Sequence, residues 1–130
     1  MSATATGVLE VEEVSGVPVV RVGPRRLFLE AAEAFREELL QIARESASSV
    51  VVDLTNVNVM NSSALGALIL ASDTLRKRGM ELVVANPGPV LRQVLSRTKL
   101  DTILTVAPSV EEALALVSRG ADAEPSSTHP

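Results

Sequence analysis

The side chains that could carry chemistry gather in one short segment, Asn61-Ser62-Ser63, which precedes an apolar helical pattern. A serine hydroxyl can accept a phosphoryl group. The first turn of a helix also leaves unpaired amide N–H groups at the positive end of the helix dipole. A phosphate on Ser62 or Ser63 would be stabilised there. Serine and asparagine are equally preferred as N-cap residues, so local chemistry alone favours capping by Asn61 or Ser62.

Other kinds of catalytic chemistry find little support. The chain has no cysteine, which excludes disulfides, thiolate metal sites and thiol nucleophiles. Its only histidine, His129, stands beside the last residue, so a histidine-based triad has no base. The adjacent carboxylates fall on predicted solvent faces or in a first helical turn: Glu12-Glu13, Glu37-Glu38 and Glu111-Glu112. We therefore predict a protein that is not an enzyme, with no catalytic residues, no cofactor and no metal site.

Composition narrows the class of protein further. A chain of 130 residues with 46% apolar and 22% charged residues predicts a single packed domain. The net charge of −4 and the presence of only two aromatic residues, Phe28 and Phe35, argue against nucleic acid as a partner. Residues 1–6 lack the pattern of a signal peptide, and no apolar run is long enough to cross a bilayer. We expect a cytoplasmic protein without a membrane partner.

The segments around the serine pair alternate between strand and helix patterns, which predicts an α/β fold. Two β-branched runs, Val8–Val14 and Val17–Val22, flank Ser15-Gly16 and predict an antiparallel hairpin. Further strands are expected at Val50–Leu54, Leu82–Ala85 and Ile103–Val106, and right-handed crossovers would make them parallel. Four helices are expected: from Glu30, from about Ser62 to Gly79, from Asn86-Pro87, and behind a capping box formed by Ser109 and Glu112.

Two familiar phosphate or nucleotide sites fit this pattern poorly. Asp53 ends a buried strand, as the acceptor aspartate of a receiver domain does, but such a domain needs an acidic pair where its first strand runs into a helix. Here Glu12-Glu13 precede Ser15-Gly16 and a second strand. We expect Asp53 to order the adjoining loop through hydrogen bonds. The turn Asn86-Pro87-Gly88-Pro89 lacks the glycine spacing of a dinucleotide-binding site.

Residues 51–68, with the sequence VVDLTNVNVMNSSALGAL, resemble the signature of STAS domains and specifically of bacterial anti-sigma factor antagonists. The order of the expected elements matches that family over residues 8–118. The resemblance implies a mixed sheet with its helices packed mainly on one face. It also implies partner switching, in which the antagonist binds a serine-kinase anti-sigma factor, frees a sigma factor, and is switched off by phosphorylation.

The resemblance assigns roles to individual residues. The phosphorylated serine matches Ser63, with Ser62 as second choice, and a partner surface is implied at Asn61, Ser62, Ser63 and Ala64. A phosphatase would be a further partner. Asn61 stands where the family commonly has Asp, and Ala64 stands where Gly is usual, so we expect this loop to be a slower kinase substrate.

A second reading keeps the fold and changes the role. A STAS domain can also be a scaffold in a stressosome-like assembly or a subunit beside a lipid-transport ATPase. Such a subunit needs no acceptor hydroxyl, so the serine pair favours the antagonist. The domain is expected to span residues 1–118. Residues 119–130 contain no apolar period and are expected to form a flexible tail.

Overall fold

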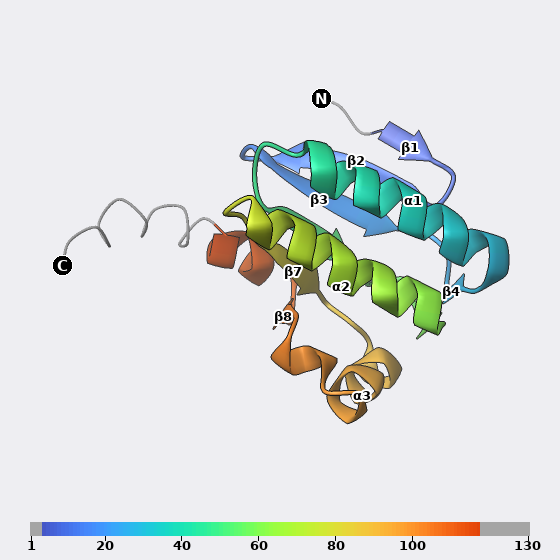
Figure 1. Cartoon of the computed structure of the whole chain (residues 1–130). Helices are drawn as coiled ribbons and strands as arrows, with labels where there is room; N and C mark the ends of the chain where they lie inside the picture. Colours follow the sequence, from blue (N-terminus) through green and yellow to red (C-terminus); the bar gives the residue numbers. More distant parts are fainter. Residues whose placement is uncertain (1–3, 118–130) are drawn as a thin grey trace.

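The computed structural model describes residues 4–117, and the expected alternation of strands and helices is present (Figure 1). The strands are β1 (Thr4–Thr6), β2 (Leu9–Val14), β3 (Val17–Val22), β4 (Arg26–Leu27), β5 (Val50–Asp53), β6 (Val59–Met60), β7 (Leu82–Ala85) and β8 (Thr105–Ala107). The helices are α1 (Leu29–Glu45), α2 (Ser62–Lys77) and α3 (Pro89–Arg97), a 3₁₀ helix η1 (Leu100–Thr102), and helical residues 110–117. The tail predicted at residues 119–130 lies outside the described residues.

Six strands form the main sheet in the order β1-β2-β3-β5-β7-β8. The pairs β1–β2 and β2–β3 are antiparallel, and the pairs β3–β5, β5–β7 and β7–β8 are parallel. Ser15 and Gly16 make the hairpin turn with positive φ angles of 52° and 81°, as a two-residue turn between twisted strands requires. The predicted mixed sheet, with an N-terminal hairpin followed by parallel strands, is confirmed.

Alternating residues of the central strands feed two separate cores, because successive side chains of a strand point to opposite faces. Val52 and Val84 belong to the large buried cluster that also holds Phe35 of α1 and Leu68 of α2. Helices α1 and α2 lie side by side over that face (Figure 1). On the other face Val51 and its neighbours form a smaller cluster with residues of the helical segment 110–117. The helices therefore lie mainly, but not wholly, on one face.

Helix α2 has well-defined signals at both ends. Asn61 is its N-cap, and its side-chain oxygen accepts a hydrogen bond from the N–H of Ala64 at 2.9 Å. At the other end Gly79 adopts a left-handed φ of 78°. The N–H groups of Gly79 and Met80 then donate to the carbonyls of Arg76 and Leu75, at 3.0 and 2.8 Å. These two hydrogen bonds form a Schellman cap, which explains why the helix ends just before Gly79, as the sequence predicted.

The predicted start of the third helix is wrong by a few residues. Asn86 has a left-handed φ of 54°, Gly88 is an extended N-cap, and α3 begins at Pro89. A residue that precedes proline is disfavoured in the helical region, so Gly88 cannot be helical before Pro89. Pro89, rather than Pro87, is therefore the proline of the first helical turn.

The last predicted strand is also displaced. Residues 100–102 form η1, Ile103 is exposed, and β8 starts only at Thr105, which pairs with Val83. The carbonyl of Ile103 accepts a hydrogen bond from Arg76 of α2 instead of from a neighbouring strand. The following capping serine is confirmed, since the hydroxyl of Ser109 accepts from the N–H of Glu112 at 3.0 Å. No helix among residues 4–117 is long and apolar enough to cross a membrane.

Candidate functional site

The serine pair occupies the first turn of α2, immediately after the cap. Because Asn61 supplies the capping oxygen, Ser62 and Ser63 are the first two residues of the helix. Ser62 is exposed and Ser63 is half-buried. Within the described part of the chain, neither hydroxyl makes a hydrogen bond. Their amide N–H groups stand at helix positions that have no intrahelical acceptor. The first turn of α2 thus presents two free hydroxyls beside unpaired amides.

A two-stranded parallel sheet, which the sequence did not indicate, holds this turn in place. Strand β4 pairs with β6, so that Leu27 lies opposite Met60. The N–H of Asn61 donates to the carbonyl of Leu27 at 3.0 Å, and the N–H of Asn58 donates to the carbonyl of Arg25 at 2.7 Å. Leu27 is fully buried. The entry to α2 is therefore fixed to the segment that leads into α1.

The loop between β5 and β6 is ordered from its other end by Asp53. This residue is only 5% exposed, and one of its carboxylate oxygens accepts hydrogen bonds from both the N–H and the hydroxyl of Thr55. Its second oxygen lies 3.5 Å from Nε of Arg21 on β3. Asn86, after β7, donates to the Thr55 hydroxyl at 3.0 Å. The predicted loop-ordering role of Asp53 is borne out, and the network joins the ends of three neighbouring strands.

Ala64 makes no part of the exposed surface, because its side chain is completely buried. Its N–H is already bonded to Asn61. The partner contact expected at Ala64 would therefore have to act indirectly, through the packing of the first turn.

Exposed apolar side chains lie on the elements that adjoin the serine pair. Phe28 and Leu29 directly follow β4 and are 38% and 82% exposed, and Leu29 has a left-handed φ of 50°. Val90 is exposed on α3, which contacts β6. From the sequence, these residues were not assigned to a functional surface. The available signal was the pair Phe28-Leu29, in which an apolar residue stands at the N-cap of α1 where a capping side chain is usual.

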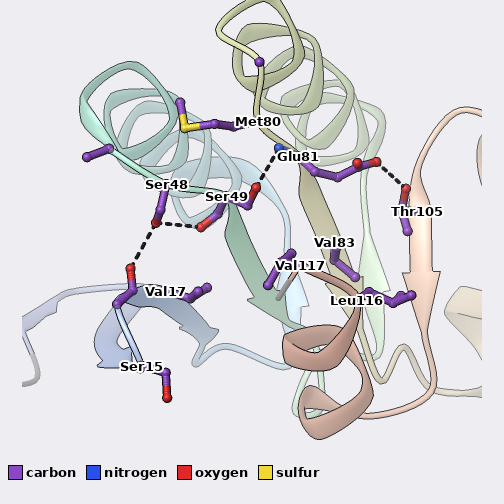
Figure 2. A pocket seen from close by; sticks show the side chains of 13 residues that line it. Ser15, Val17, Ser48, Ser49, Met80, Glu81, Val83, Thr105, Leu116 and Val117 are labelled. Atoms are coloured by element: carbon purple, nitrogen blue, oxygen red, sulfur yellow. Dashed lines mark hydrogen bonds between the residues drawn. The ribbon is translucent and has the colours of Figure 1, made fainter. Parts of the chain in front are cut away.

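A cavity lies at the opposite end of the sheet from the serine pair. It measures about 590 Å³ and is lined by the turns that precede β3, β5 and β7, and by Thr105, Leu116 and Val117 (Figure 2). The carboxylate of Glu81, which lines it, accepts a hydrogen bond from the hydroxyl of Thr105 at 2.9 Å. Among residues 4–117, no lysine or arginine lines the cavity. The described part of the chain therefore presents no cation to a phosphate there, and none of these lining residues belongs to the first turn of α2.

The adjacent carboxylates that could suggest acid–base or metal chemistry are dispersed. Glu12 lies on β2 and pairs with Arg21 at 3.7 Å. Glu37-Glu38 lie on α1, and Glu111-Glu112 lie in the helical segment 110–117. Across the described residues, no three acidic or histidine side chains are grouped closely enough to hold a metal ion.

The profile of the STAS domain family matches residues 8–113, so the chain belongs to the STAS domain family. Three solved structures illustrate the proteins that share its fold. An anti-sigma factor antagonist from Mycobacterium paratuberculosis is 28% identical, with a TM-score of 0.75 over 90% of this chain and 95% of that one. The phosphorylated form of the Bacillus cell fate determinant SpoIIAA is 22% identical, with a TM-score of 0.63 over 84% and 98%. The murine anion transporter Slc26a9 is 19% identical, with a TM-score of 0.65 over 82% of this chain but only 18% of the transporter.

Proposed function

We propose that this STAS domain is an anti-sigma factor antagonist that binds a serine-kinase anti-sigma factor and is switched off by phosphorylation of Ser63. The observation that carries the proposal is the free, solvent-accessible hydroxyl of Ser63 in the first turn of α2. Family membership and the similarity to an antagonist over nearly the whole chain support the same role. The protein would work in the cytoplasm, where such a partner meets the transcription machinery.

The chemistry of the switch would be supplied by the partner. The kinase would transfer the γ-phosphoryl group of ATP to the Ser63 oxygen, forming a new P–O bond and breaking the bond to ADP. A base on the kinase would take the hydroxyl proton. This chain supplies the acceptor and the surface around it, including Asn61 and Ser62, and performs no catalysis of its own. A phosphatase would remove the phosphate and restore the binding form.

Phosphorylation would act on the complex more than on the fold. It adds about 1.5 to 2 negative charges to a small hydroxyl. In the free protein the unpaired amides and dipole of α2 would stabilise that charge by roughly 0.3 to 2 kcal/mol. In the complex, the same charge would face kinase groups arranged for a neutral serine. Repulsion and desolvation would then weaken binding.

The experiment is incubation of the purified protein with its candidate kinase and ATP, followed by mass-spectrometric mapping of any phosphate. We expect one phosphate on Ser63, none in Ser63→Ala, and normal labelling of Ser63 in Ser62→Ala. Absence of labelling, or labelling that survives in Ser63→Ala, would remove the proposal.

A second candidate is favoured by one finding, the match to a domain that makes up 18% of an anion transporter. Here the domain would be a permanently bound subunit of a larger assembly, either a stressosome-like scaffold or a lipid-transport ATPase. Such a subunit would bind its partner equally well with alanine or aspartate at position 63.

A further inference from the structure

Arg36 extends from α1 toward the helix that carries the serine pair. Its Nη1 lies 4.0 Å from the position that a Cβ atom on Gly66 of α2 would occupy. The residue is half-buried. Within residues 4–117 its guanidinium takes part in no ion pair or hydrogen bond, although Glu33 and Glu37 stand on the same helix. An arginine held against a neighbouring helix without a partner has its full donor capacity available.

Gly66, which the guanidinium approaches, is three residues after Ser63 on α2. Residues three apart on a helix are surface neighbours, with Cβ atoms roughly 5–6 Å apart. A side chain at position 66 would lean toward the helix N-terminus and cover the turn that carries Ser63. Glycine leaves that surface open. Arg36 thus approaches α2 at a residue about one turn beyond Ser63, and no side chain at position 66 covers the surface of the turn that carries Ser63.

The charges around the first turn of α2 are mixed, and Arg36 approaches the helix at Gly66. Helix α2 has no acidic residue in its first turn. On the adjoining segment, Arg25 and Arg26 precede α1, and the exposed carboxylates of Glu30 and Glu33 lie in the first turns of α1.

We propose that Arg36 is the counter-ion of a phosphoryl group on Ser63. The proposal rests on the proposed function in taking Ser63 as the modified residue. A guanidinium can donate two parallel hydrogen bonds to a phosphate, and such charge-assisted bonds are stronger than neutral ones. The two helices α1 and α2 would then be bridged only in the phosphorylated form. The pairing would stabilise the dianion and retain the phosphate against the surface of the domain.

The test uses protein with phosphoserine installed at position 63 during synthesis, so no kinase is needed. A pH titration followed by ³¹P NMR gives the second pKa of the phosphate, which is about 6 for an unpaired phosphoserine. We expect a lower value in the parent, a rise of several tenths of a unit in Arg36→Gln, and a smaller rise in Arg36→Lys, which keeps the charge but loses the two-point geometry.

Arg44→Gln is the matched control. It removes the same charge from the last turn of α1, about 12 Å further along the helix axis and beyond a Debye length at physiological salt. Equal pKa values in the parent and Arg36→Gln would overturn the proposal, as would an equal rise in Arg44→Gln. If Arg36 shifts the pKa but no kinase labels Ser63, the proposed function fails and the pairing stands.

Discussion

Ser63 and Asn61 have separate roles at the start of α2. The sequence left capping and phosphate acceptance open for the same short segment. In the structure the cap is the side chain of Asn61, and the hydroxyls of Ser62 and Ser63 are left free of structural bonds within the described residues. Replacing either serine should therefore have little effect on folding, whereas replacing Asn61 should lower stability because the cap is lost.

The capping role can be measured directly. Asn61→Ala removes the only side-chain acceptor for the Ala64 N–H, so we expect a loss of about 1 kcal/mol in the free energy of unfolding. Urea denaturation gives the value. Asn58→Ala is the control, since the structure shows only a backbone bond for this exposed residue, and it should stay within about 0.5 kcal/mol. Equal losses in the two variants would contradict the assignment of the cap.

Asn61 and Ala64 differ from the Asp and Gly that the STAS resemblance leads us to expect, and we predict that both differences slow phosphorylation of Ser63. Asn61→Asp restores a carboxylate at the N-cap, and Ala64→Gly removes a buried methyl group and loosens the first turn. The double variant should be phosphorylated faster than the parent by the same kinase. Initial rates of phosphate incorporation decide the matter, and unchanged rates would mean that these departures have no kinetic consequence.

Among the elements, the loop between β5 and β6 determines where the serine pair lies. Asp53 holds the first half of this loop through Thr55, and β4 holds the second half through β6. The site is thus set from two sides by residues that would not touch the partner.

This positioning gives a prediction for Asp53→Ala. The variant leaves the N–H of Thr55 without its acceptor and Arg21 without its buried partner. We expect a loss of about 1–3 kcal/mol in unfolding free energy, together with weaker binding of the anti-sigma factor. Glu12→Ala removes another Arg21 partner that is half exposed, and it should cost less than about 0.5 kcal/mol. If Asp53→Ala behaves like Glu12→Ala in denaturant, the loop is not ordered by this carboxylate.

Elements with a periodic pattern were predictable from the sequence. Local signals mark the hairpin around Ser15-Gly16, the buried strand β5, and the end of α2 at Gly79. The sheet of β4 and β6 does not, because each strand has two residues and they pair across more than thirty positions. The approach of Arg36 to Gly66 likewise depends on how two helices pack. Local patterns cannot predict such contacts, because the paired residues are far apart in the sequence.

At the scale of the whole molecule, the serine pair and the cavity of Figure 2 lie at opposite ends of the parallel strands of the main sheet. Leu116 and Val117 of the helical segment 110–117 line this cavity. Residues Ala113 and Val117 of this segment are buried in the second core, beside Val51. The segment is therefore part of the folded domain.

Truncation after Ser118 should accordingly leave folding intact, because residues 119–130 carry no apolar pattern. We expect the thermal midpoint to change by less than about 2 °C, well below the shift that about 1 kcal/mol would cause. Truncation after Ser109 is the contrast, since it exposes the second core and should lower the midpoint strongly. A large drop on removing residues 119–130 alone would show that they are docked on the domain.

The central claim, that charge on Ser63 switches partner binding, is tested most directly by titration calorimetry with the anti-sigma factor. Ser63→Ala should bind permanently and with the affinity of the unmodified protein. Ser63→Asp should bind at least tenfold more weakly, which corresponds to about 1.4 kcal/mol. Ser62→Ala should bind like the parent. Equal affinities for Ser63→Ala and Ser63→Asp would contradict the account and leave a permanently bound scaffold or transport subunit as the better one.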